Sequence, residues 1–181
     1  MLNQALRAAL LDPSVFDEFG EEPESMFRSM GVVIVAALGF GLGLWSEFRT
    51  GAASGESTAL LMLAFVAVST IVLGWSVCAV LVWAIGNKGF GSSTGYRTGL
   101  RALGICFAPI TFWLFLNVPI IGAPLALLAH VWTLPACVVA VHKTLELAWW
   151  KAGIAVAFGW AWGLVVIPLF MVLIPAADEF G

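Results

Sequence analysis

Long stretches without charged side chains dominate this sequence and limit what it can fold into. Charged residues flank four such stretches of 18, 31, 41 and 26 residues, at 29–46, 57–87, 102–142 and 152–177. A helix needs about 20 mostly apolar residues to cross a hydrocarbon core about 30 Å thick. Only 10% of the 181 residues are charged, which is too little to cover the surface of a soluble domain. The sequence therefore predicts an all-α, polytopic membrane helix bundle.

The lengths of these stretches predict five transmembrane helices. The 41-residue stretch is long enough for two crossings. Pro119 divides it, because proline disfavours helix in the residue before it. We expect a membrane domain at residues 28–175, with helices at about 29–46, 59–85, 99–117, 119–141 and 152–174.

The positively charged residues predict how this bundle is oriented. An odd number of spans places the two termini on opposite sides, and all lysines and arginines except Arg49 then fall on the N-terminal side. Because cytoplasmic loops carry an excess of Lys and Arg, we expect a cytoplasmic N-terminus and an outside C-terminus, with 176–181 as a short external tail. The cations expected to mark topology or contact lipid headgroups are Lys88, Arg97, Arg101, Lys143 and Lys151.

Residues 1–27 form an acidic lead-in that we expect to be cytoplasmic. Leucines recur in it at helical spacing, which is compatible with an amphipathic helix on the membrane surface. Its six acidic residues weaken binding to anionic lipid, so a protein contact and a solvated tail are alternatives. The leucines are Leu2, Leu6, Leu10 and Leu11, and the acids are Asp12, Asp17, Glu18, Glu21, Glu22 and Glu24.

Residues suited to catalysis or metal binding are scarce in the expected spans. The single Asp, Glu, Lys or Arg within them is Arg101, near the start of 99–117, although ion-coupled transporters and intramembrane proteases normally need such groups deep in their spans. His130, Cys137 and Cys106 are a poor set of zinc ligands, so we expect His130 to be hydrogen-bonded to a carbonyl or hydroxyl. We predict no enzymatic activity, no metal, no cofactor and no soluble substrate. The chain is not basic, so it lacks the electrostatic basis for nucleic-acid binding.

Two glycine patterns have structural interpretations. Gly39 and Gly43 are spaced for close helix approach, either within the bundle or between two copies of the chain. The glycine-rich stretch at 86–99 has Ser92 where a phosphate-binding Walker loop needs lysine. A polar turn between two membrane helices is the better interpretation of 86–99.

A series of short features, spread over most of the chain, resembles the YIP (Ypt-interacting-protein) domain family in its bacterial branch. The resemblance implies five helices with a cytoplasmic N-terminus, protein partners, and residence in the bacterial inner membrane. Eukaryotic members of that family are trafficking factors that contact Rab-type GTPases and other YIP proteins. The features are Leu11-Asp12-Pro13 with Phe16, the stretch Gly86, Lys88, Gly89, Gly91, Ser92, Ser93, Tyr96 and Arg97, then Ala108-Pro109, Pro119-Ile120-Ile121-Gly122, Trp132 and Lys151-Ala152.

Two functional classes remain open at this point. The first is a non-enzymatic membrane protein of YIP type that acts through protein partners or membrane organisation, in contact with lipids, with self-association as one option for the partner. The second is a small channel or transporter for a neutral, apolar or lipid solute. Proline-bent helices and the polar residues Asn117, His130 and Thr133 favour the second class.

Overall fold

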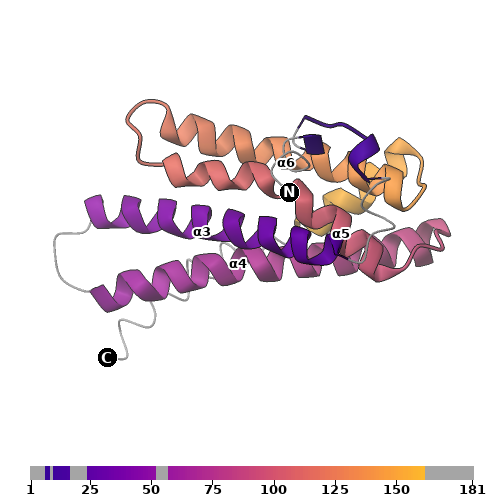
Figure 1. Ribbon diagram of the computed structural model, residues 1–181, viewed down its shortest axis with the longest axis horizontal. Coiled ribbons are helices and arrows are strands. Elements are labelled where there is room, and N and C mark those ends of the chain that lie inside the picture. The colour runs from indigo at the N-terminus through magenta and orange to yellow at the C-terminus, as the bar shows by residue number, and fades with distance from the viewer. Residues whose placement is uncertain (1–6, 9, 17–23, 52–56, 162–181) are drawn as a thin grey trace.

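The computed structural model is a bundle of helices that run roughly along one common axis (Figure 1). It describes residues 7–8, 10–16, 24–51 and 57–161, and all regular secondary structure in these residues is helical. The elements in chain order are α3 (Ser25–Gly51), α4 (Ser57–Ala84), the π-helix η1 (Ile85–Gly89), α5 (Tyr96–Cys106), the 3₁₀-helix η2 (Ala108–Phe115) and α6 (Gly122–Thr144). After α6, another helix starts at Trp149 and is described as far as residue 161.

Four segments of the described chain are long and apolar enough to cross a membrane. The second half of the expected fifth span, at 152–174, lies outside the described residues, so the five-span topology and the orientation remain predictions. The four candidate spans are Ser25–Ser46, Ala67–Gly89, Tyr96–Phe115 and Gly122–Thr144.

The third candidate span differs from the single helix expected at 99–117. The α-helix α5 ends at Cys106, and the chain continues as the 3₁₀-helix η2. The cause is Pro109, which has no N–H to donate and whose ring clashes with the carbonyl four residues earlier in an α-helix. Bonds of the tighter i to i+3 type replace the α-helical ones here, as in the 3.0 Å bond from the Ile110 N–H to the Phe107 carbonyl.

The ends of the other helices also differ by a few residues from those expected. α3 begins at Ser25 instead of 29, and α4 is prolonged as the π-helix η1 as far as Gly89. α6 spans Gly122–Thr144 instead of 119–141. The later start of α6 follows from the turn before it, where Ile120 has a φ of 73° that no α-helix accommodates.

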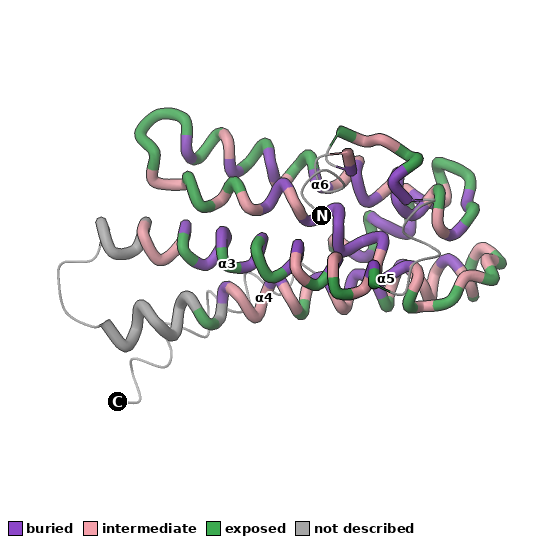
Figure 2. Tube along the Cα trace, in the orientation of Figure 1, coloured by how far each residue is buried: buried purple, intermediate pink, exposed green. Residues whose placement is uncertain are grey.

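Small buried residues hold the helices together. α3 packs against α4, α5 and η2, and α6 packs against α5 and η2. Figure 2 shows the buried residues along the inner faces of these helices. In α6 the buried face repeats at helical spacing, and short side chains there permit close approach of the helices. Its members are Ala126, Ala129, Thr133, Ala136, Cys137 and Ala140.

Gly39 and Gly43 lie where α3 crosses η2. A Cβ atom added to Gly39 would lie 2.8 Å from the carbonyl oxygen of Thr111, and one added to Gly43 would overlap the carbonyl of Trp113. Phe40, between the two glycines in sequence, places its ring 4.6 Å from the Trp113 ring. The two glycines therefore allow direct contact between the backbones of α3 and η2 inside one chain.

The described part of the N-terminal lead-in packs onto the bundle. Ala8, Val15 and Phe16 are almost fully buried, so these residues are not a solvated tail. Most of the expected amphipathic helix at 2–11 lies outside the described residues.

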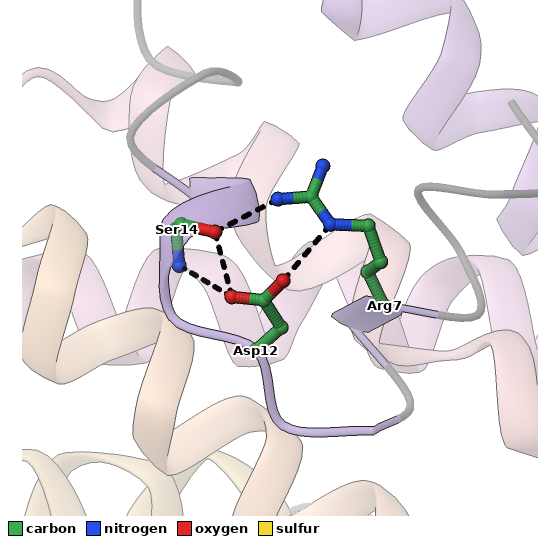
Figure 3. A network of polar contacts seen from close by, with 3 residues as sticks. All are labelled: Arg7, Asp12 and Ser14. Atoms are coloured by element: carbon green, nitrogen blue, oxygen red, sulfur yellow. Dashed lines mark hydrogen bonds and ion pairs between the residues drawn. The ribbon is translucent and has the colours of Figure 1, made fainter.

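A polar network closes the turn of this lead-in (Figure 3). The Arg7 Nε donates to an oxygen of Asp12 at 2.9 Å, and the Ser14 hydroxyl and N–H donate to the other oxygen at 2.6 and 3.0 Å. The Ser14 hydroxyl, followed by Arg7, lowers the pKa of Asp12 to about 2. Asp12 is therefore ionised at neutral pH, and its carboxylate orders the turn that leads to Val15 and Phe16.

The contact between α3 and η2 predicts an unequal response to two glycine substitutions. Gly43→Ala should destabilise the protein by about 1–3 kcal/mol, because the backbone of η2 must move to admit the methyl group. Gly74→Ala is the matched control, because a Cβ added to Gly74 in α4 meets nothing within 4 Å. Thermal unfolding in detergent measures both variants. Equal unfolding temperatures for the two would contradict the close contact.

Candidate functional site

Two polar connections meet at one end of the bundle. One is the segment 90–95 between η1 and α5, and the other is the segment 145–148 between α6 and the helix that starts at Trp149. The Thr94 hydroxyl donates to the Thr144 carbonyl at 2.9 Å and links the two connections. Both lie at the same end of the bundle in Figure 1.

The segment 90–95 is held in shape by bonds to the end of the preceding helix. The Thr94 carbonyl accepts hydrogen bonds from Trp83 Nε1 at 3.2 Å and from Asn87 Nδ2 at 2.9 Å. The Ser92 N–H donates to the Gly86 carbonyl at 3.0 Å. Gly91 has a φ of 77°, a left-handed conformation in which glycine has no steric cost. These bonds make the segment a defined loop.

The segment 145–148 is anchored by apolar side chains and by a histidine. Leu145 and Leu147 are buried, and Gly86 leaves room for Leu145, because a Cβ there would overlap its side chain. The His142 Nδ1–H donates to the Leu147 carbonyl at 2.6 Å, and the His142 ring stacks on Trp149 with centroids 3.9 Å apart. His142 thus braces the connection from the end of α6.

A polar pocket of about 240 Å³ lies between the two connections. Its walls are formed by residues 90–94, residues 145–148 and Lys151. Three hydroxyl groups, one ammonium and one carboxylate lie on these walls. They belong to Ser92, Ser93, Thr94, Lys151 and Glu146.

Aromatic rings hold the ammonium of Lys151 beside this pocket. Its Nζ atom lies 5.4 Å from the Phe90 ring centroid and 5.6 Å from that of Trp150. The two rings contact each other edge to face at 5.9 Å. An ammonium over an aromatic face is attracted by the negative face of the ring, so the two rings restrict the position of this charge with no acidic partner among the described residues.

The other four expected headgroup cations lie outside the pocket lining. Lys88, Arg97 and Lys143 are exposed, and Arg101 is half-buried. Arg101 contributes its carbonyl to helix packing, where it accepts a hydrogen bond of 2.5 Å from the Ser29 hydroxyl of α3. The structure thus brings only Lys151 of the five together with the polar groups of the pocket.

Polar residues within the candidate spans bond mainly to neighbouring helices or to their own helix. The Thr133 hydroxyl donates to the Ala129 carbonyl at 2.9 Å. This bond satisfies the hydroxyl inside its span, where water is absent. Asn117, in the turn between the third and fourth candidate spans, donates through Nδ2 to the Ser46 hydroxyl of α3.

His130 is not held as expected from the sequence. Its ring lies edge-on to Trp160 at 4.7 Å and to Trp113 at 6.1 Å, and its buried Nδ1 has no hydrogen-bond partner in the described part of the chain. The thiol of Cys106, the cysteine weighed with His130 as a zinc ligand, donates to the carbonyls of Ala102 and Ala136, at 3.2 and 3.3 Å. Among the described residues, no three His, Cys, Asp or Glu side chains form a metal site.

Sequence reasoning missed most of the pocket. His142, Glu146 and the hydroxyls of 92–94 were not proposed as site residues. The one available signal was topological, because the expected topology places the 86–98 and 142–151 segments on the same side of the membrane. Which side chains face each other across the two segments depends on the packing of Leu145 and Leu147, which no local pattern reveals.

The brace at His142 predicts how the pocket responds to substitution. His142→Ala removes both the hydrogen bond and the ring stacking, each worth about 0.5–1.5 kcal/mol. His142→Phe is the matched control that keeps a stacking ring without the hydrogen bond. Hydrogen exchange of the 145–148 amides should be fastest in His142→Ala and intermediate in His142→Phe. Exchange as slow as in the unmodified protein would show that the brace has no such role.

Comparison with protein families identifies the chain. The Yip1 domain matches residues 7–173, which includes the lead-in, the helices and both connections of the pocket. No match is found among curated proteins or among solved structures. Yip1 domain proteins form a membrane-trafficking family that is not known for enzymes, and they interact with other proteins. With its four apolar candidate spans, this chain is a multi-pass membrane protein that belongs to the Yip1 domain family.

Proposed function

We propose that this protein acts without enzymatic chemistry, by binding protein partners within the membrane and organising the bilayer around them. The outer face of α6 carries the argument. It exposes a continuous strip of large apolar side chains over consecutive turns, on the side opposite the buried alanines. The strip consists of Leu127, Leu128, Val131 and Trp132, and we name it the α6 strip.

The composition of the α6 strip suits a helix–helix contact in lipid. Leu127 is 65% exposed and Trp132 is 43% exposed, so both protrude from the bundle. In a bilayer apolar exposure alone does not drive association, because lipid tails are equally apolar. A protruding tryptophan next to a leucine ridge does offer the shape complementarity on which van der Waals packing depends. The protein contacts of the family support this use of the strip.

Site-specific photo-crosslinking tests this proposal. A photoreactive phenylalanine derivative in place of Leu128, on the α6 strip, should give a reproducible protein adduct in native membranes. The same substitution at Val80, which is exposed on α4, is the matched control and should give lipid adducts alone. An adduct of twice the chain mass identifies a second copy as the partner. Lipid adducts alone at both positions would exclude a stable partner on the α6 strip.

A channel or transporter for a neutral, apolar or lipid solute is the second candidate. Pro109 and Pro135 interrupt or bend the helices, and His130 retains a buried ring nitrogen without a partner in the described part of the chain. The internal bonds of Asn117 and Thr133 favour the first candidate, because a solute path needs polar groups that are free to bind solute. Solute flux into liposomes that contain the purified protein would instead support the transporter.

We further propose five spans, a cytoplasmic N-terminus, an outside C-terminus and residence in the bacterial inner membrane, with Lys88, Arg97, Arg101, Lys143 and Lys151 at the cytoplasmic headgroups. The support is the excess of cations on one side of the expected topology.

Charge reversal tests this orientation. Changing the exposed Lys88, Arg97 and Lys143 together to Glu should reduce correct insertion, measured with a reporter fused after Gly181, because cationic loops are retained in the cytoplasm. The variant Lys88→Arg, Arg97→Lys, Lys143→Arg keeps the charge and is the control. Unchanged reporter orientation in the Glu variant would refute the role of these cations.

A further inference from the structure

We propose that the polar pocket between residues 90–94 and 145–148 binds a zwitterionic phospholipid headgroup of the phosphoethanolamine class. In this assignment Lys151 and the Ser93 hydroxyl bind the phosphate, and Glu146 binds the primary ammonium. The proposal concerns a lipid site and does not depend on the protein partner proposed for α6.

The phosphate half of the site is formed by Lys151 and the segment 92–94. Lys151 is half-buried, and its ammonium is held by the rings of Phe90 and Trp150. The Thr94 and Ser92 hydroxyls donate to the Thr144 carbonyl and to Thr94. Ser93 is exposed on the pocket wall and is the hydroxyl with most freedom to turn toward a ligand. A cation with hydroxyl donors beside it is suited to phosphate oxygens.

The ammonium half of the site is Glu146. It lies in the short connection after α6 with a φ of 53°, a left-handed conformation that is uncommon for residues other than glycine, asparagine and aspartate. Such conformations cluster at ligand sites, where the surrounding structure holds them. Glu146 and Lys151 line the same pocket, yet no ion pair joins them in the described part of the chain. A pocket is thus left with two opposite charges that do not neutralise each other.

The surroundings of the pocket place it at headgroup depth. Trp149 and Trp150, which start the last described helix beside it, are 54% and 61% exposed. Exposed tryptophans are typical of the membrane–water interface. The volume of about 240 Å³ is smaller than the ~300–1,000 Å³ of sites for drug-sized ligands, as is appropriate for a headgroup alone.

The charge pattern discriminates between headgroups. A purely anionic headgroup could bind its phosphate to Lys151 but would leave the Glu146 carboxylate without a cationic partner, and a free cation would be repelled by Lys151. A choline headgroup has the right charges but no N–H to donate to the carboxylate. A primary ammonium donates hydrogen bonds as well as carrying charge, so ethanolamine is favoured over choline.

Lipid binding to the full-length protein tests this assignment. Native mass spectrometry in detergent would compare phosphatidylethanolamine, phosphatidylcholine and phosphatidylglycerol with identical acyl chains. We expect the ethanolamine lipid to be retained at least about fivefold more than either of the others. Equal retention of the three lipids, or preference for phosphatidylglycerol, would overturn the proposal.

Three variants locate the binding to this pocket. Glu146→Gln should abolish the preference for ethanolamine over choline, and Lys151→Gln should weaken binding of both. Lys88→Gln is the matched control, because Lys88 is an exposed cation at the same end of the bundle but does not line the pocket. Glu146→Asn provides a second test without the carboxylate, because asparagine tolerates the left-handed backbone. Preference retained in both Glu146 variants would overturn the assignment.

Soluble phosphoethanolamine distinguishes the lipid from a free metabolite. It should displace the lipid only at concentrations far above those of the lipid, because the acyl chains contribute to binding at headgroup depth. Displacement in the unmodified protein and its loss in Lys151→Gln would support recognition of the headgroup itself. Tight binding of the soluble compound without retention of the lipid would overturn the lipid assignment in favour of a soluble phosphoamine.

Discussion

At Gly39 and Gly43 the backbone of α3 approaches the backbone of η2 too closely for a side chain to fit between them. η2 in turn packs against α6, and α3 packs against α4 and α5, so this crossing sets the distance between α6 and the pair α4 and α5. In lipid there is little hydrophobic drive between helices, and close van der Waals contact must replace it. The glycine contact meets that need where α3 crosses η2, a 3₁₀-helix.

The same packing brings the two polar connections together at one end of the bundle. α5 and α6 are in contact, which places the start of α5 and the end of α6 near each other. Thr94 then bonds to Thr144, and His142 braces Leu147. The pocket with its hydroxyls, Glu146 and Lys151 therefore results from helix spacing in the hydrocarbon region together with short connections outside it. The two charged residues follow the loop hydroxyls by about 50 residues in the sequence. Only the folded chain brings them together.

Much of the bundle followed from the sequence because its strongest signals are local. Charge-free stretches of sufficient length predicted the helices of four candidate spans, and short motifs predicted the family that the Yip1 domain match confirms. The break of the third span at Pro109 was missed, since proline was used to divide the chain only at Pro119. The hydrogen bond expected of His130 is not made by its Nδ1 to any described residue, because its neighbours Trp113 and Trp160 come from elements that only tertiary packing brings to it.

The amino-acid order alone was enough to predict that lipid surrounds most of the chain, that the fold is helical and that a polar turn lies within 86–99, because each depends on the composition of one continuous stretch. The turn itself is shorter than expected and occupies 90–95, between η1 and α5. The structure decided that this turn is one wall of a pocket. The opposite wall of the pocket, at 145–148, is positioned by the buried Leu145 and Leu147, whose side chains pack against Gly86. Long-range side-chain packing carries no periodic signal in a sequence, and for that reason Glu146 and Lys151 become two charges of one site only in the folded chain.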